Sequence, residues 1–396
     1  MIASGAEWSS IAHDIMKIVA DPNIPFVQEA FGPLGEVTLV PGRKMDAAAV
    51  REAQLLLVRS VTPVNAGLLD GSAVKFVATA TIGTDHVDEA YLAGRDIGFA
   101  SAAGSNANSV AEYIVAALLE MSHRQGFRLR QKTLGIVGVG NVGKRVLRNA
   151  VALGLRVLPC DPPRQRFESM PKFVKLDQVV AEADLITLHV PLIRRDQLAG
   201  LRKYRSEDVT QHLFDGPRFS TLAQRPILIN SSRGAVVDNR ALLAAFQWRK
   251  VTGAVLDVWE GEPSLLPGLL DRVDLSTPHI AGYSFDGKVN GTRMIYEAAC
   301  RHFGLNPTWQ PALPVVPPQA VTVSPNDDDE DVLRQIVRQS YDITADDAAL
   351  RKTPHEFDKL RAEYPVRREF QNVALTVRGG TAALQQKLTA LGFRVS

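Results

Sequence analysis

The sequence predicts an α/β protein built from two Rossmann-like, doubly wound domains and a small C-terminal α+β domain. Short apolar segments alternate with helical segments along most of the chain, a pattern that is typical of parallel sheets flanked by helices. The alternation starts again near residue 133, which indicates a second domain of this kind. A proline-rich segment at 306–318 separates the C-terminal part, and 396 residues are too many for one ordinary domain.

The first domain is expected to begin at Met16, because residues 1–15 precede the first apolar strand and look like an extension. A long helix is expected over 108–122, where Ile114 and Leu118 share one helical face. The strands expected before this helix are 16–20, 36–40, 55–58, 75–79 and 97–100.

The second series of strands is followed by a helix at 288–303. The prolines in 306–318 exclude a helix or an interior strand there, so this segment is a linker. An acidic run at 327–331 then begins the C-terminal domain. The strands expected in the second series are 133–137, 156–160, 185–189, 227–230, 254–258 and 273–276.

Composition excludes several classes of protein. Lys and Arg number 45 against 43 Asp and Glu, a net charge of +2, which argues against a nucleic-acid or anionic-membrane partner. No apolar run reaches the roughly 20 residues of a membrane span, and the N-terminus has no secretion signal. Cys160 and Cys300 form neither a metal motif nor a disulfide framework, so we expect no metal and a cytoplasmic location.

The segment TLGIVGVGNVG combines an apolar strand, a G-x-G-x-x-G motif and the start of a helix. Gly138 permits a tight turn, Gly140 lets the backbone approach a pyrophosphate, and Gly143 lets helix and strand pack closely. Asn141 and Val142 begin the helix, whose N-terminus would face the anion. The motif therefore predicts a dinucleotide site.

Asp161 ends the next strand, where a Rossmann fold places the carboxylate that accepts hydrogen bonds from a ribose diol. A carboxylate there repels a 2′-phosphate, so the predicted cofactor is NAD rather than NADP. Arg164 and Arg166 are close enough in sequence to weaken this preference. The plainer interpretation is a set of turn glycines with a surface aspartate.

Three later segments place polar side chains directly after predicted strands. Arg233 follows one strand, Asp257 and Glu262 follow the next, and His279 follows the last. Ligands of open α/β sheets bind beyond the carboxyl ends of the strands, so these side chains are expected to converge. Taken singly, each has a plainer interpretation, as a surface arginine, a helix-start carboxylate or a packed turn histidine.

Together they suit the oxidation of an alcohol next to a carboxylate. The imidazole of His279 would accept the hydroxyl proton near neutral pH. Glu262 would hold the ring and favour its protonated form. Arg233 would bind the carboxylate with a planar fork and polarise the developing carbonyl.

The motifs GVGNVG, CDPP, NSSRGAVVD, LDVWEGEP and TPHIAGY resemble the D-2-hydroxyacid dehydrogenase family. The resemblance implies that Arg233, Glu262 and His279 are catalytic and that Asp161 binds the ribose. The further NAD contacts that it implies are Val190, Ser231, Ser232, Arg233, Asp257 and Gly282. The substrate contacts that it implies are Ser60, Thr81 and Tyr283.

The segments ADPNIPF, EVTLVPGR, LLLVRSVTPVN, KFVATATIGTDHVDEA and EFDKLR resemble one branch of this family. The resemblance implies oxidation of a small phosphorylated 2-hydroxy acid at C2, for pyridoxal phosphate synthesis, by a homodimer. The domains that it implies are a substrate domain (16–107 and 280–304), an NAD domain (108–279) and a linker with a dimerisation domain (305–396). A dehydrogenase for another D-2-hydroxy acid such as phosphoglycerate, or a non-catalytic NAD-sensing protein, remains an alternative.

Two basic features keep two interpretations each. Arg59, beside Ser60, is either an anchor for the substrate phosphate or a salt-bridged structural residue. The basic segment 194–219 is either a mobile loop near an anionic ligand or a solvated surface insertion. His86 is expected either to order the loop that presents Thr81 or to have a core or capping role.

Overall fold

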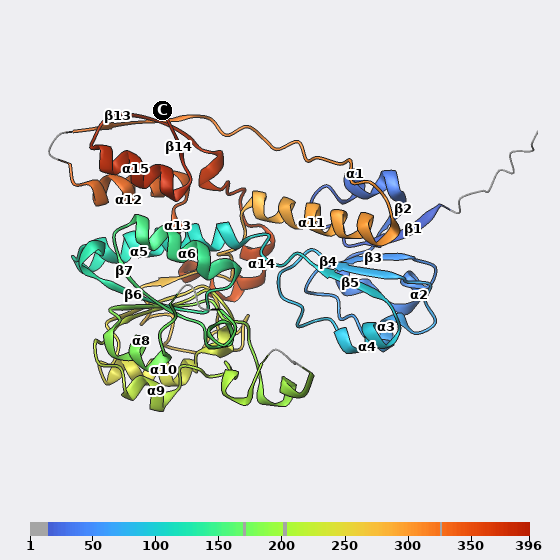
Figure 1. Ribbon diagram of the computed structural model, residues 1–396, viewed down its shortest axis with the longest axis horizontal. Helices are drawn as coiled ribbons and strands as arrows, with labels where there is room; N and C mark the ends of the chain where they lie inside the picture. Colours follow the sequence, from blue (N-terminus) through green and yellow to red (C-terminus); the bar gives the residue numbers. More distant parts are fainter. Residues whose placement is uncertain (1–14, 169–171, 201–203, 325–326) are drawn as a thin grey trace, which may run out of the picture. The chain divides into compact units, whose positions relative to one another are not determined.

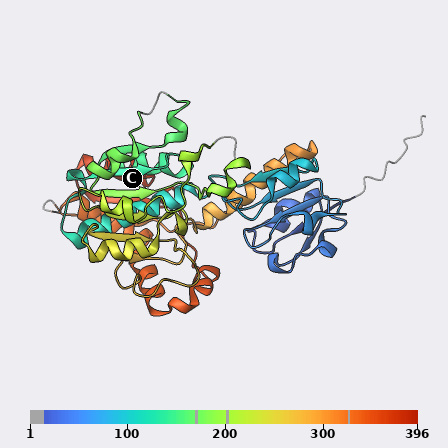
Figure 2. The ribbon, with the colours of Figure 1, turned by 90° about the horizontal axis from the view of Figure 1, so that it is seen from below.

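The computed structural model describes residues 15–168, 172–200, 204–324 and 327–396 (Figures 1 and 2). The predicted extension therefore lies outside the described residues, apart from Ile15. The chain forms two compact units: unit 1 holds the residues up to Ala103 together with Val289–Pro311, and unit 2 holds Gly104–Lys288 together with Ala312–Ser396. Each contains a parallel sheet flanked by helices, and a third, small sheet lies near the C-terminus, which confirms the predicted fold class.

Unit 1 is built on five parallel strands in the order β2-β1-β3-β4-β5. The central strands β3 and β4 are entirely buried and, apart from Thr79, apolar, as expected for a sheet covered on both faces. The strands are β1 (Met16–Ala20), β2 (Gly35–Leu39), β3 (Leu55–Val58), β4 (Phe76–Thr79) and β5 (Gly98–Ser101).

Separate apolar clusters cover the two faces of this sheet. One cluster joins the sheet to α1 and to the C-terminal part of α11, and the other joins it to α2, α3 and α4 (Figure 1). Asp46, Asn65 and Asp88 cap the short helices α2, α3 and α4 through their side chains. The helices are α1 (Val27–Phe31), α2 (Ala47–Val50), α3 (Ala66–Leu69), α4 (Glu89–Gly94) and α11 (Phe285–Phe303).

Unit 2 contains a six-stranded parallel sheet in the order β11-β10-β9-β8-β6-β7. The chain runs outward from β6 to β7, then returns past β6 to β8, so the strand order reverses between β6 and β8. This reversal is where dinucleotides bind in doubly wound sheets. The strands are β6 (Thr133–Val137), β7 (Arg156–Cys160), β8 (Leu185–Leu188), β9 (Ile227–Asn230), β10 (Gly253–Leu256) and β11 (Leu275–Ser276).

Helices α5 and α6 cover one face of this sheet, and α8, α9 and α10 cover the other (Figure 1). The helices are α5 (Ala107–Gln125), α6 (Asn141–Ala152), α7 (Pro162–Gln165), α8 (Leu176–Glu182), α9 (Gly216–Ser220) and α10 (Asn239–Gln247). The predicted strands of both units are all present, and their ends differ from the predicted ones by at most two residues. No helix among the described residues has the length and apolar character needed to cross a membrane.

Short 3-10 helices occupy several connections. The basic segment 194–219 contains η4, η5 and α9, and its residues 201–203 lie outside the described part. These helices are η1 (Gly32–Leu34), η2 (Gly42–Lys44), η3 (Leu129–Gln131), η4 (Arg195–Gly200), η5 (Ser206–Asp208), η6 (Gly234–Val236), η7 (Pro354–Glu356) and η8 (Phe370–Asn372).

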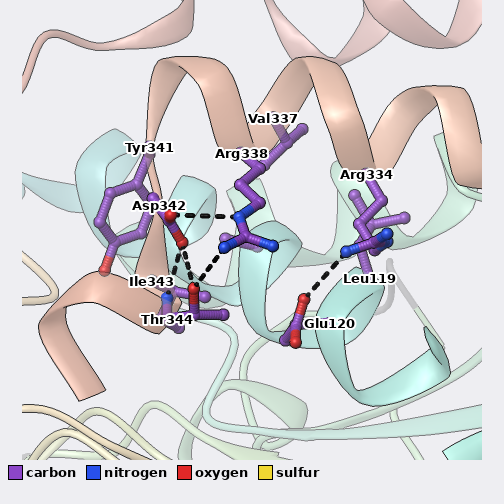
Figure 3. A pocket seen from close by; sticks show the side chains of 10 residues that line it. Leu119, Glu120, Arg334, Val337, Arg338, Tyr341, Asp342, Ile343 and Thr344 are labelled. Carbon is purple, nitrogen blue, oxygen red and sulfur yellow. Dashed lines mark hydrogen bonds and ion pairs between the residues drawn. The ribbon is translucent and has the colours of Figure 1, made fainter. Parts of the chain in front are cut away.

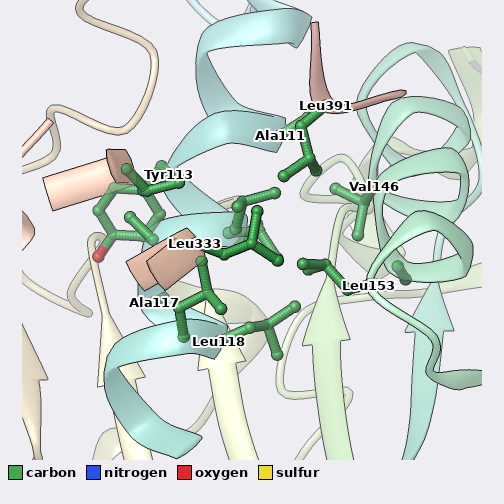
Figure 4. Packing of buried hydrophobic residues seen from close by; sticks show 14 of the residues in the cluster. Ala111, Tyr113, Ala117, Leu118, Val146, Leu153, Leu333 and Leu391 are labelled. Atoms are coloured by element: carbon green, nitrogen blue, oxygen red, sulfur yellow. The ribbon is translucent and has the colours of Figure 1, made fainter. Parts of the chain in front are cut away.

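The C-terminal region, residues 312–396, adds three parallel strands in the order β12-β13-β14. Its helices α12 and α15 pack on α5 and α6, so that Leu333 and Leu391 meet Ala111 and Val146 (Figure 4). The elements are β12 (Gln319–Val323), α12 (Asp329–Ser340), α13 (Ile343–Lys352), α14 (Phe357–Ala362), β13 (Ala374–Gly379), α15 (Ala382–Leu391) and β14 (Arg394–Val395).

The C-terminal region, which is predicted as a domain of its own, shares the apolar core of unit 2. Every residue of α5 from 109 to 122 is buried, and a helix that is buried all round needs partners on both sides. The chain crosses between the two compact units near 103 and 288, and the functional division at 107 and 279 stays a prediction. The start of α11 is held in unit 2 because the N–H of Phe285 donates to the carbonyl of Arg367 at 2.8 Å.

A shared core predicts that damage to α12 destabilises the whole of unit 2. The side chain of Leu333 is 1% exposed, so Leu333→Ala should lower the free energy of unfolding by about 2–5 kcal/mol. Denaturant titration followed by tryptophan fluorescence measures this change. Leu313→Ala, at a position that is 40% exposed, is the control and should change it by less than about 0.5 kcal/mol. An early separate transition for the C-terminal region would contradict a shared core.

Candidate active site

The turn between β6 and α6 has two glycines whose neighbours leave no room for a side chain. Gly138 has a φ of 88°, and a Cβ there would lie 2.6 Å from the carbonyl oxygen of His189. A Cβ at Gly143 would lie 2.1 Å from the carbonyl oxygen of Gly138. Only glycine therefore permits this close approach of strand and helix.

The third glycine of the motif, Gly140, faces open space, since a Cβ there would meet no heavy atom within 4 Å. Helix α6 begins at Asn141, and no side chain caps its first turn. Its first backbone N–H groups can therefore bind an anion. The side chain of Val142 packs against the apolar core, so it is the backbone of this residue that faces a ligand. These features fit the pyrophosphate of NAD.

The carboxylate of Asp161, directly after β7, is held beside this turn. Oδ2 accepts a hydrogen bond from the N–H of Val139 at 2.8 Å, and Oδ1 accepts one from the N–H of Arg164 at 3.1 Å. The guanidinium groups of Arg164 and Arg166 are each paired with a nearby carboxylate. The two arginines that could have favoured a 2′-phosphate are thus neutralised, and Asp161 remains suited to a free ribose diol.

Polar side chains follow three neighbouring strands at the same edge of the sheet. Arg233 follows β9, Glu262 follows β10, and His279 follows β11. Nδ1 of His279 lies 2.5 Å from Oε1 of Glu262, so the structure brings these two predicted residues into direct contact. Arg233 donates from Nη1 to the carbonyl of Ser232 at 2.8 Å.

The environment of Glu262 keeps its side chain ionised. Burial is the largest single effect on the pKa of Glu262 and acts to raise it. The net pKa is nevertheless below its ordinary value, because the hydrogen bond with His279, the charge of that ring and two further contacts act against burial. The N–H of Trp259 donates to Oε2 at 3.1 Å, and the positive charge of Arg361 lowers this pKa further. Because Nδ1 of His279 is held by a carboxylate, Nε2 is the ring nitrogen left for a substrate.

The backbone at His279 is held in a left-handed conformation, with φ 57°. Its N–H donates to the carbonyl of Asp257 at 2.7 Å. The buried carboxylate of Asp257 accepts from the hydroxyl of Thr277 at 2.7 Å and from the N–H groups of Ile280 at 2.7 Å and Ala281 at 3.0 Å. Burial raises the pKa of Asp257. This residue, predicted as an NAD contact, therefore also holds the turn that presents the imidazole.

Three residues that support this turn were missed at the level of sequence. The hydroxyl of Tyr113, on α5, lies 2.9 Å from that of Thr277. The indole N–H of Trp259 donates to the carbonyl of Thr277 at 3.1 Å, and the ring is 1% exposed. The tryptophan in LDVWEGEP was a possible signal, but no local pattern indicates that Tyr113 reaches a turn so distant along the chain.

The segment after β9 is shaped by Asn230. Its Oδ1 accepts from the N–H of Ser232 at 3.1 Å and from the hydroxyl at 2.8 Å, while its Nδ2 donates to the carbonyl of Arg233 at 3.0 Å. The hydroxyl of Ser231 is buried and has no hydrogen-bond partner among the described residues. A buried hydroxyl of this kind fits a polar group of the cofactor.

Two other predicted NAD contacts lie in tightly packed backbone. Val190 borders the glycine turn, since a Cβ at Gly138 would lie 2.9 Å from its Cγ1. A Cβ at Gly282 would lie 2.0 Å from Nδ2 of Asn106, at the start of α5. Both Val190 and Gly282 are thus placed to offer backbone rather than side-chain contacts.

The predicted substrate residues fall in both units, with Tyr283 in unit 2. In unit 1, the hydroxyl of Thr81 lies 2.8 Å from that of Thr79, which lies 3.0 Å from Nε2 of His86. Burial lowers the pKa of His86, so a neutral ring orders this loop as predicted. Ser60 is exposed directly after β3. Within the described parts of the chain, Arg59 forms no ion pair, which favours its interpretation as an anion anchor.

Comparison with known proteins gives matches along nearly the whole chain. The chain is 43% identical to an erythronate-4-phosphate dehydrogenase from Chromohalobacter salexigens, and the match covers 96% of this chain and 99% of the relative. The protein of the same name from Edwardsiella ictaluri is 47% identical, again over 96% and 99%.

Domain and structure comparisons give the same assignment. Residues 102–281 match the NAD binding domain of D-isomer specific 2-hydroxyacid dehydrogenases, and residues 312–392 match a domain of unknown function, DUF3410. A crystal structure of D-lactate dehydrogenase from Aquifex aeolicus, complexed with NAD and lactic acid, is similar with a TM-score of 0.58 at 25% identity. This match covers 73% of this chain and 96% of that one. The chain therefore belongs to the erythronate-4-phosphate dehydrogenases, NAD-dependent enzymes of the D-isomer specific 2-hydroxyacid dehydrogenase family.

Proposed function

We propose that this protein oxidises 4-phospho-D-erythronate at C2 to 2-oxo-3-hydroxy-4-phosphobutanoate, a step towards pyridoxal phosphate. The observation that carries this proposal is the contact of 2.5 Å between His279 and Glu262, at the edge of the sheet that also carries the glycine turn. The names of the relatives that match nearly the full chain supply the substrate.

In this reaction Nε2 of His279 takes the proton of the C2 hydroxyl. Glu262 fixes the other ring nitrogen and stabilises the imidazolium that forms. Arg233 binds the substrate carboxylate and polarises the developing carbonyl. NAD, when bound, supplies the hydride acceptor.

The remaining predicted roles belong to this proposal. Residues 16–107 and 280–304 form the substrate-binding part, in which Ser60, Thr81 and Arg59 contact the substrate together with Tyr283. NAD is bound by the residues 108–279. The proposal also includes a homodimer through 305–396 and a cytoplasmic location. The two buried free cysteines support the location, because free thiols are usual in a reducing compartment.

A substrate screen tests the proposal directly. With NAD, 4-phospho-D-erythronate should give the highest kcat/KM, measured as NADH absorbance at 340 nm, among this acid, 3-phosphoglycerate, lactate and glycerate. A preference for 3-phosphoglycerate would favour the alternative dehydrogenase. Absence of turnover with all four, despite tight NAD binding, would favour an NAD-sensing protein.

Loss of the proposed base should stop chemistry and leave the cofactor site intact. His279→Ala should lower kcat by about 10² or more, because the group proposed to take the hydroxyl proton is lost. The Kd for NAD, measured by calorimetry, should change little. His123→Ala, at an exposed position near the end of α5, is the matched control and should retain normal turnover. Wild-type turnover in His279→Ala would show that the base is another group.

The two glycines on either side of Asn141 should respond differently to alanine. Gly140→Ala should raise the Kd for NAD about tenfold or more with unchanged stability, since its Cβ enters only the space left for a pyrophosphate. Gly143→Ala should lower the free energy of unfolding by about 1–3 kcal/mol, since its Cβ meets the carbonyl of Gly138. Calorimetry and thermal melts measure both. Unaltered NAD binding in Gly140→Ala would place the pyrophosphate elsewhere.

A further inference from the structure

Helix α14 of the C-terminal region places an arginine beside a predicted substrate residue. Nη2 of Arg361 donates to the hydroxyl of Tyr283 at 3.1 Å, and its guanidinium carbon lies 5.7 Å from the centre of that ring. The edge of the Tyr364 ring packs on Tyr283 from the same region, with ring centres 6.2 Å apart. A segment that lies far along the chain thus surrounds Tyr283.

The hydrogen-bonding capacity of Arg361 is largely unused. Its Nε is buried without a partner among the described residues, and the nearest carboxylate, that of Asp358, is 3.9 Å away. Two other arginines of this region, Arg368 and Arg351, use more of their donors than Arg361 does. Arg368 binds both carboxylate oxygens of Asp286, and Arg351 binds Asp347 and two backbone carbonyls.

The position of Arg361 is fixed by the same apolar core that supports the contact between His279 and Glu262. Phe357, one turn earlier on α14, is 1% exposed and belongs to one cluster with Trp259, whose N–H binds Glu262. The charge of Arg361 is close enough to lower the pKa of Glu262. Arg361 is therefore a cation held by buried packing near Glu262, and its side chain is 25% exposed.

We propose that Arg361 is a substrate-binding residue that, with the hydroxyl of Tyr283, holds the phosphate of the substrate. This inference rests on the proposed function, in which Arg233 already binds the carboxylate. A planar guanidinium with unused donors matches a phosphate dianion. Lys288, with its Nζ 4.5 Å from the centre of the Tyr283 ring, adds positive charge.

The extent of the structural match supports this assignment. The D-lactate dehydrogenase is covered almost completely, yet about a quarter of this chain has no counterpart in it. Lactic acid carries no phosphate. The region that carries Arg361 matches a domain model of its own (residues 312–392), apart from the residues 102–281 that match the NAD binding domain of the D-isomer specific 2-hydroxyacid dehydrogenases.

An arginine-lined hollow of the C-terminal region does not offer such a site. It lies between α5 and α12 (Figure 3), where Arg334 pairs with Glu120 at 3.4 Å and Arg338 pairs with Asp342 at 3.1 Å. The charges there are neutralised. Arg338 therefore provides a matched control on the same region of the chain.

The test uses the full-length protein with Arg361→Met and Arg361→Lys, beside Arg338→Met. Arg361→Met should raise KM for 4-phospho-D-erythronate about 30-fold with a smaller change in kcat, because a charged hydrogen-bond partner of the phosphate is lost. Inorganic phosphate should inhibit the wild type in competition with 4-phospho-D-erythronate, and its inhibition constant should rise in Arg361→Met by the same factor as KM. Arg361→Lys, which keeps the charge without the planar fork, should fall between wild type and Arg361→Met. Arg338→Met should match the wild type.

The outcomes separate this inference from the function on which it rests. An unchanged KM and unchanged phosphate inhibition in folded Arg361→Met would overturn the inference about Arg361. The proposed function would still stand if the wild type oxidises 4-phospho-D-erythronate. An equal loss with D-erythronate and its 4-phosphate would assign Arg361 a structural role and would also overturn it. Failure of the wild type to oxidise 4-phospho-D-erythronate would instead overturn the proposed function. Should Arg361→Met not fold, the KM for 4-phospho-D-erythronate and the inhibition constant of inorganic phosphate in Arg361→Lys decide the question.

Discussion

The hydrogen bond between His279 and Glu262 is the interaction on which the proposed function of this protein depends. A free imidazole can lose or gain its proton at either nitrogen, whereas a ring bound through Nδ1 to a carboxylate presents only Nε2. The bond persists because Glu262 stays ionised. Burial is the largest single effect on its pKa and raises it, but His279, the backbone N–H of Trp259 and the charge of Arg361 together lower the pKa below its ordinary value. Removal of either side chain would leave the other partly buried and unpaired.

Much of unit 2 serves to hold this pair in place. Asp257 binds both sides of the turn around His279, and Trp259 links that turn to the backbone that carries Glu262. Tyr113 adds a hydroxyl from α5. The left-handed conformation of His279 is unfavourable for a residue with a side chain, so these hydrogen bonds must outweigh its cost. The turn is consequently preorganised before any ligand binds.

The C-terminal region is a structural part of the NAD-binding unit. It buries the outer face of α5. Through Arg367 it also holds the start of α11, which is the helix by which the chain leaves unit 2. Its helix α14 joins the core around Trp259 and reaches Tyr283. One region therefore supports both the long central helix and the surroundings of the candidate active site.

The sequence by itself determined the order and type of the strands, the glycine turn and the strand ends that carry Arg233, Glu262 and His279. These features are local, because each depends on apolar periodicity or on a few adjacent residues. The buried polar supports and the incorporation of residues 312–396 into unit 2 were decided by the tertiary structure alone. They arise from contacts such as that of Tyr113 with Thr277, or of Arg361 with Tyr283, between residues whose sequence neighbours do not indicate a partner. Packing brings such residues together only when all the helices and strands are assembled, and for that reason local pattern cannot predict them.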